Sequence, residues 1–154
     1  MRTKTLKLSI FFGVLVGTLC SATAAPAAEE LEQAVGRTGR AMGAGVFQVT
    51  VPRAEAITES GMPLLPAMGL VTVLNFQAVA DGRAAITGDF VLIDKEVNPV
   101  ARTLRQHVID VTAIHNHGLL DIPRLFYMHF WAADVPAKLA QGLKGALDQT
   151  NSQR

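Results

Sequence analysis

The sequence has a single cysteine, and it lies at position 20, close to the N-terminus. Residues 1–24 have the pattern of a signal peptide: three basic residues, an apolar run over residues 10–19, and the small residues Ala22-Thr23-Ala24. We expect cleavage after Ala24, with Ala27 as a second candidate. Cys20 leaves with this segment, so the expected mature chain has no disulfide, no thiolate ligand and no cysteine nucleophile.

Long hydrophobic runs and basic patches are also missing. The apolar run of residues 10–19 is shorter than the ~20 residues that a membrane-spanning helix needs, so we expect no transmembrane segment in the mature chain. Without the signal, 11 basic residues stand against 13 acidic ones over residues 25–154, a formal charge of −2. This charge makes nucleic acid an unsuitable partner. We therefore expect one periplasmic or secreted domain, residues 25–154, after a signal peptide of residues 1–24.

Hydrophobic periodicity predicts an α+β fold for this domain. Helical patterns are expected over residues 29–42, from Asn98-Pro99 onwards and from Asp134 onwards. Alternating or apolar runs predict strands over residues 46–51, 70–79, 84–93, 108–117 and 125–131. The order α-β-β-β-α-β-β-α indicates a largely antiparallel, five-stranded sheet with helices packed on one face. Asp81-Gly82 predicts a hairpin turn, and Gly88 indicates a bulge or a close backbone approach.

Three of the four histidines lie within 15 residues, at positions 115, 117 and 129. Residues i and i+2 of a strand point to the same face, so His115 and His117 are neighbours. If His115 pairs with His129 across a hairpin, and His117 with Tyr127, all three imidazoles meet on one face. A register change of one residue would send His129 to the other face. Because imidazole is the commonest metal ligand, the pattern predicts a site for a divalent ion, zinc or copper.

Other readings of this cluster stay open at this stage. A zinc-dependent hydrolase or lyase with an activated water would need a general base, for which Glu96 is the first candidate and Asp110 the second. Alternatively, a metal-free envelope module would bind a small molecule or a partner through Tyr127 and Trp131. Arg124 would either bind an anion near the cluster or pair with Asp121. The fourth histidine, His107, lies near a helix end and is expected to be structural.

Several stretches together resemble one family. The fairly specific part is residues 111–117, with His-Asn-His, followed by Pro123-Arg124 and Met128-His129-Phe130. Residues 45–53, 88–92 and 96–100 fit as well. Over residues 31–148 the chain thus resembles the LppY/LpqO-like family of exported bacterial proteins, a domain of unknown function. The resemblance implies export and a shared site around the histidines, and it implies no particular reaction.

Overall fold

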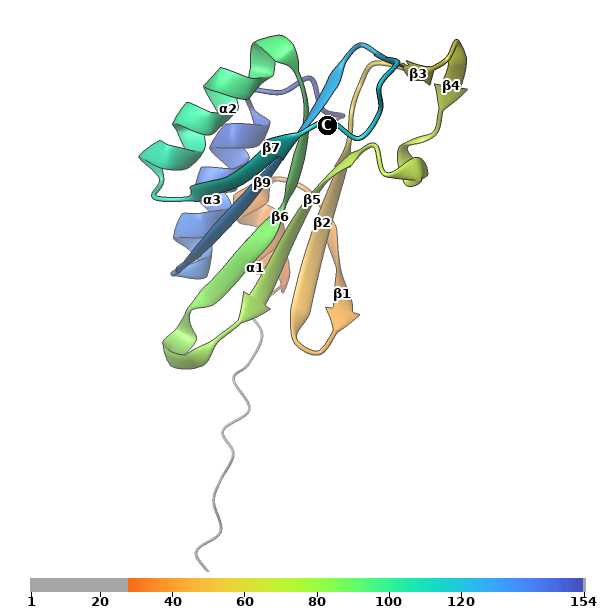
Figure 1. Cartoon of the computed structure of the whole chain (residues 1–154). Helices are drawn as coiled ribbons and strands as arrows, with labels where there is room; N and C mark the ends of the chain where they lie inside the picture. Colours follow the sequence, from red (N-terminus) through yellow and green to blue (C-terminus); the bar gives the residue numbers. More distant parts are fainter. Residues whose placement is uncertain (1–27, 154) are drawn as a thin grey trace, which may run out of the picture.

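An antiparallel sheet of six strands lies at the centre of the domain (Figure 1). The computed structural model describes residues 28–153, so the predicted signal peptide and its cleavage sites lie outside the described residues. Across the sheet the strands are β1 (Gly39–Gly43), β2 (Val46–Pro52), β5 (Val71–Ala78), β6 (Ala84–Ile93), β9 (Leu125–Asp134) and β7 (Asp110–His115). The five predicted strands are all present, and β1 adds a sixth at one edge.

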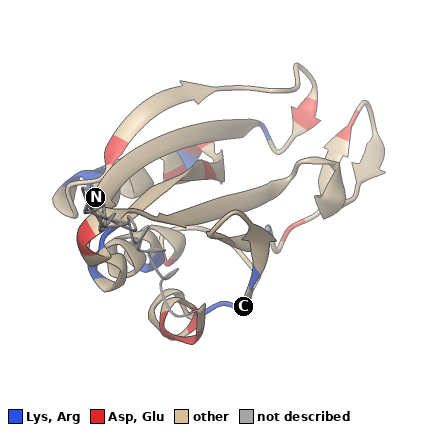
Figure 2. Ribbon diagram, turned by 90° about the horizontal axis from the view of Figure 1, so that it is seen from below, with Lys and Arg blue, Asp and Glu red and all other residues tan. Residues whose placement is uncertain are grey.

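Three helices cover one face of this sheet: α1 (Ala28–Val35), α2 (Asp94–Gln106) and α3 (Pro136–Leu147) (Figure 1). Alternate residues of the central strands point into this layer, among them Leu74, Phe90 and Phe130, which are fully buried. From the helices Leu104 and Leu143 meet them. Most of the strand length carries no charged residue (Figure 2). The predicted α+β class, with helices on one face, is therefore confirmed.

A second, smaller sheet projects beyond one end of the first (Figure 1). It consists of β4 (Met62–Leu64), β3 (Ile57–Glu59) and β8 (Asp121–Ile122), with short 3₁₀ helices at Pro66–Met68 and Ala80–Gly82 elsewhere. A separate apolar cluster joins the two sheets and includes Ile57, Leu70 and Tyr127. The sequence predicted only a loop for this region, because three-residue strands are too short to show alternation.

Two predicted helix boundaries are wrong. The first helix ends at Val35 instead of residue 42, and the residues after it form β1 on the edge of β2. The second helix begins at Asp94, five residues before Pro99, which lies inside the helix. Glu96 explains the early start, because its Oε2 accepts the amide of Ile93 at 3.0 Å and satisfies a donor at the helix N-terminus. In the described residues no helix is long and apolar enough to cross a membrane.

The two predicted glycine-dependent features are confirmed. Asp81 and Gly82 both have positive φ, 62° and 68°, in the turn between β5 and β6. Gly88 allows a close approach within the sheet, because a Cβ atom there would lie 1.9 Å from the carbonyl oxygen of Val73 on β5. Only glycine leaves room for that backbone.

We therefore expect Gly88→Ala to lower the free energy of unfolding by about 3 kcal/mol, because β5 and β6 would have to separate. Gly43→Ala is the matched control: it also adds one methyl group, and nothing lies within 4 Å of its Cβ position. Its left-handed φ of 88° should cost only about 1 kcal/mol. Urea unfolding of both variants gives the comparison, and equal losses would contradict the close-approach explanation.

Candidate functional site

A bulge in β7 determines which way the first histidine of the cluster points. The strand begins with Asp110 opposite Trp131 of β9, and after a shift between Val111 and Ala113 it continues with His115 opposite Tyr127. Without the extra residue His115 would pair with Phe126, whose face is covered by helices. The bulge thus turns His115 to the open face of the sheet.

The register differs from the predicted one by two residues. We expected His115 opposite His129 and His117 opposite Tyr127, but the structure pairs His115 with Tyr127 and Ala113 with His129. Since the change is an even number of residues, the faces are preserved. His129 and His115 remain on one face as diagonal neighbours, and His117 lies just beyond the end of β7.

The three imidazoles are in contact. The Nε2 atoms of His115 and His129 lie 2.8 Å apart, and the two rings are stacked with centroids at 4.9 Å. Only one of these nitrogens can carry the proton of this hydrogen bond, so the other accepts it through its lone pair. The His117 ring is 4.9 Å from that of His115. The side chains of His115 and His117 are exposed, and that of His129 is half-buried.

His117 rests on an aromatic neighbour. Its ring stacks on Tyr127, with centroids 3.5 Å apart and an interplanar angle of 15°. Burial by this contact lowers the pKa of His117, and the nearby His115 lowers it further, whereas Asp89 opposes the shift. Tyr127 itself is buried and donates a hydrogen bond from its hydroxyl to the Gly69 carbonyl at 3.2 Å. The lowered pKa favours the neutral form of the stacked ring, which is the form that coordinates metals.

Asp89 is the member of the site that sequence reasoning missed. It lies on β6 directly opposite His129, with its side chain on the open face. Burial raises the pKa of Asp89, while the three histidines act in the opposite direction. A signal was present in the sequence, since Asp89 is the only charged residue between Ala84 and Ile93. The site thus contains one carboxylate beside three imidazoles.

The structure does not place Glu96 in this cluster. Its carboxylate forms two hydrogen bonds with the buried guanidinium of Arg53, at 2.8 and 3.0 Å, and accepts the amides of Ile93 and Asn151. Burial would raise the pKa of Glu96, but the hydrogen bonds from Arg53 and the two amides outweigh it and lower the pKa. Every oxygen of Glu96 is already bonded, so this residue has a structural role.

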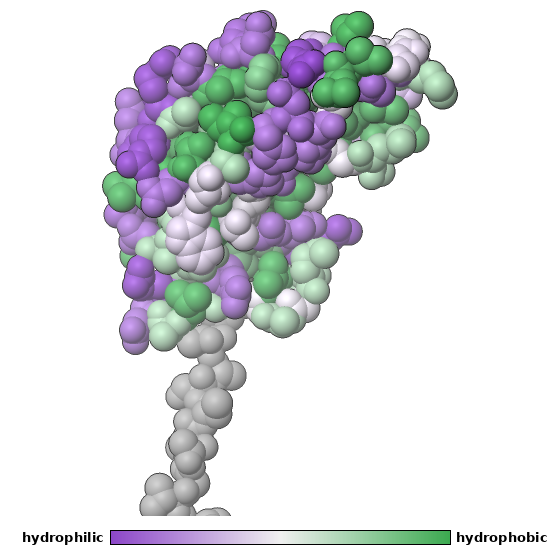
Figure 3. All heavy atoms as spheres, viewed as in Figure 1, coloured by the Kyte–Doolittle hydropathy of each residue, from purple (hydrophilic) through white to green (hydrophobic). Residues whose placement is uncertain are grey.

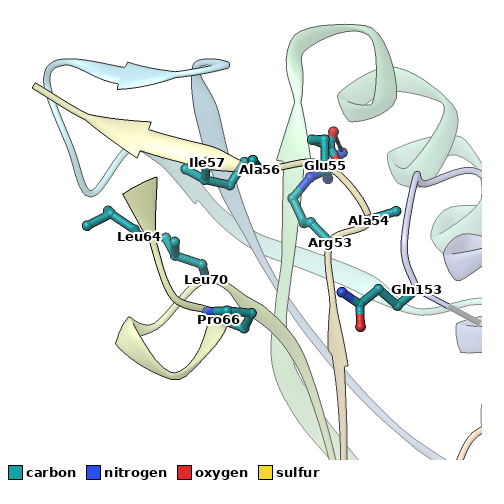
Figure 4. A pocket seen from close by; sticks show the side chains of 9 residues that line it. All are labelled: Arg53, Ala54, Glu55, Ala56, Ile57, Leu64, Pro66, Leu70 and Gln153. Carbon is teal, nitrogen blue, oxygen red and sulfur yellow. Dashed lines mark hydrogen bonds and ion pairs between the residues drawn. The ribbon is translucent and has the colours of Figure 1, made fainter. Parts of the chain in front are cut away.

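The two terminal nitrogens of Arg53 are also fully hydrogen-bonded, like the oxygens of Glu96. Besides Glu96 it reaches Glu55 at 2.6 Å and the carbonyl of Val91 at 2.6 Å. Burial would lower the pKa of Arg53, but its bonds to Glu96 and Glu55 raise it. Arg53 and Glu55 border a cavity of about 260 Å³ at the base of the small sheet, and Leu64 lines its other side (Figure 4). Because its charges are paired, we assign this cavity no function.

The remaining candidates are dispersed. Asp110 is exposed, forms an ion pair with Arg105, and lies at the opposite end of β7 from His115. Arg124 is exposed and bonds the carbonyl of Leu119 at 2.8 Å. Trp131 is 48 % exposed and borders a cavity of about 210 Å³ on the same sheet face. Figure 3 shows hydrophilic residues gathered in the middle of the face seen in Figure 1.

Side-chain positions in the described part of the chain include no group of three or more His, Cys, Asp or Glu residues arranged to hold a metal ion. The predicted cluster is thus present as contacting rings and not as a formed coordination site. His115 and His129 share a hydrogen bond, and the third ring is turned onto Tyr127. For all three rings to coordinate one ion, the exposed rings of His115 and His117 would have to rotate.

Residues 29–149 match the model of a protein family described as Domain of Unknown Function (DUF1259). The chain belongs to this family. The finer resemblance to LppY/LpqO-like proteins stays a prediction. No curated protein and no solved structure matches the chain. The family match covers both β7 and β9, so the histidines lie within the family domain.

The buried ion pair of Glu96 with Arg53 allows a test of whether Glu96 and Asp110, the two predicted bases, have structural roles. We expect Glu96→Gln to lower the free energy of unfolding by about 3 kcal/mol, because it leaves the buried Arg53 charge uncompensated. Asp110→Asn removes an exposed partner of Arg105 and should change the free energy of unfolding by less than about 0.5 kcal/mol. Urea unfolding at pH 7 measures both, and similar values for the two variants would contradict the structural assignment of Glu96.

Asp89 should lower stability when no metal is present. Its folded-state pKa lies above that of the unfolded chain, so the folded state binds the proton more tightly and stability falls as pH rises through the interval between the two pKa values. Above that interval the ionised carboxylate is a cost, and we expect Asp89→Asn to have the higher Tm at pH 7 in EDTA. The difference should shrink towards pH 3. A lower Tm for the variant at pH 7 would contradict this account.

Proposed function

We propose that this chain is an exported protein that binds a divalent transition metal, zinc or copper, through His115, His117 and His129. The observation that carries the proposal is the contact between the Nε2 atoms of His115 and His129, 2.8 Å apart, with His117 beside them. Two nitrogens that share one proton can exchange it for a metal ion that both of them ligate. Export is supported by the signal-peptide pattern of residues 1–24.

The movements required are small. Zn–N bonds of ~2.0–2.1 Å place two imidazole nitrogens about 3.4 Å apart on a tetrahedral ion, so the His115 and His129 rings would separate by a fraction of an ångström. His117 would rotate away from Tyr127, which its exposed position permits. Asp89 lies opposite His129 and would serve as a fourth ligand or as a partner that orients the imidazole.

Several features bear on the choice among functions. Three nitrogen ligands with an open fourth position suit either zinc or copper, and intrinsic affinity favours Cu(II). The hydrolase alternative loses its predicted bases, because Glu96 and Asp110 are ion-paired to arginines and form no hydrogen bond with the histidines. Asp89 is the one carboxylate opposite a histidine on the open face. Metal binding is therefore the proposal, and no reaction is assigned to the site.

Calorimetric titration tests the proposal. Protein stripped with EDTA and dialysed should bind one equivalent of Zn(II) or Cu(II), and His115→Ala/His117→Ala should weaken the affinity by about 100-fold or more, because two of three ligands are removed. His107→Gln is the matched control and should bind as the unmodified protein does. Affinity should fall below pH 6, since protonated imidazoles do not coordinate.

A second readout comes from Trp131, the only tryptophan, which lies two residues from His129 on the same sheet face. Bound Cu(II) should quench its fluorescence with the same stoichiometry as the calorimetric signal. Unchanged affinity in the double-histidine variant would overturn the proposal. Absence of binding with either ion would also overturn it, and would leave the metal-free module that binds a ligand beside Trp131.

A further inference from the structure

Two carboxylates face each other where the small sheet closes. Glu59 on β3 lies directly opposite Asp121 on β8 in an antiparallel pair. Like charges in this position repel and destabilise a strand pair. Among the residues that the structure describes, no lysine, arginine or histidine forms an ion pair with either carboxylate. The repulsion therefore has no protein cation to offset it.

One oxygen of this pair is both buried and unbonded. Asp121 is only 8 % exposed, and its Oδ2 accepts the amide of Leu125 at 2.5 Å. Its Oδ1 is buried and has no hydrogen-bond partner in the described structure. A buried carboxylate oxygen without a partner destabilises the fold, because it has lost its hydrogen bonds to water and no protein donor replaces them. The position thus lacks a positively charged or hydrogen-donating group.

Both carboxylates lie against the backbone of Gly118. A Cβ atom at this residue would lie 2.8 Å from Asp121 Oδ1 and 2.9 Å from Glu59 Oε2. Both oxygens therefore lie within 3 Å of one point beside Gly118, close enough together for a single cation to bridge them. Calcium binds oxygen ligands at 2.3–2.6 Å, tolerates irregular geometry, and completes its shell with backbone carbonyls and water. Magnesium requires 2.0–2.1 Å and a regular octahedron, so two carboxylates from different strands suit calcium better.

We propose that a calcium site lies beside Gly118, with Asp121 Oδ1 and Glu59 Oε2 as its anionic ligands. The ligands are oxygens only, so the site prefers a hard cation and is distinct in chemistry from the imidazole cluster. The ion would replace the repulsion between β3 and β8 with a bridge. It would also fix the segment between β7 and β9, in which His117 is the residue next to Gly118.

Calorimetry and thermal unfolding with CaCl₂ as the probe test this inference. After EDTA treatment, 10 mM CaCl₂ should raise the Tm of the protein by about 5 °C, as expected for a site of submillimolar affinity. Glu59→Gln should have the higher Tm in EDTA, because the repulsion is removed, and should lose the calcium-dependent increase. Gly118→Ala should lose that increase without a change of charge, because its methyl group would push both ligand oxygens away.

The double-histidine variant separates this site from the proposed transition-metal site. His115→Ala/His117→Ala should keep the full calcium response, whatever becomes of its zinc or copper binding. A calcium response lost in that variant, retained in Glu59→Gln, or missing from the unmodified protein would overturn the inference.

Discussion

The extra residue in β7 is the constraint on which the open face of the sheet depends. Strand pairing transmits orientation two residues at a time, so a single inserted residue reverses every side chain that follows it. Here the insertion lies between Val111 and Ala113, and it brings His115 onto the face that already carries His129 and Asp89. An unbulged strand would have placed the His115 imidazole against the helices. The grouping of three rings is therefore a property of the backbone register more than of the spacing of histidines in the sequence.

Glu96 and Asp89 show how the surroundings of a carboxylate distinguish a structural residue from a candidate site residue. Glu96 is more deeply buried than Asp89, yet its pKa is lowered because Arg53 and two amides bond it. The pKa of Asp89 is raised because burial is opposed only by the neighbouring imidazoles. A charge that is fully bonded contributes to the fold, whereas one left poorly compensated on an open face is available for a ligand.

The sequence predicted the layers and strands well and the short elements poorly. Strands of seven to ten residues such as β2, β5, β6 and β9 show their alternation clearly. The five residues of β1 include two glycines, and the three residues of β3 and β4 contain no readable period. The start of α2 was misplaced because Pro99 is a strong helix-start signal, whereas the deciding contact is the local capping bond from the Ile93 amide to Glu96. Glu96 was predicted to be a base because its partner Arg53 lies 43 residues away in the chain.

The candidate site combines residues on central strands of the sheet with residues at its edge. His129 and Asp89 lie on β9 and β6, each of which is paired on both sides within the sheet. His115 is the last residue of β7, an edge strand bonded on one side only, and His117 lies in the connection that follows. Backbone with fewer hydrogen bonds opens more easily, so His115 and His117 can move towards a ligand while His129 and Asp89 stay in place. Under the proposed function, the two central residues would define where an ion binds, and His115 and His117 would supply the remaining ligands.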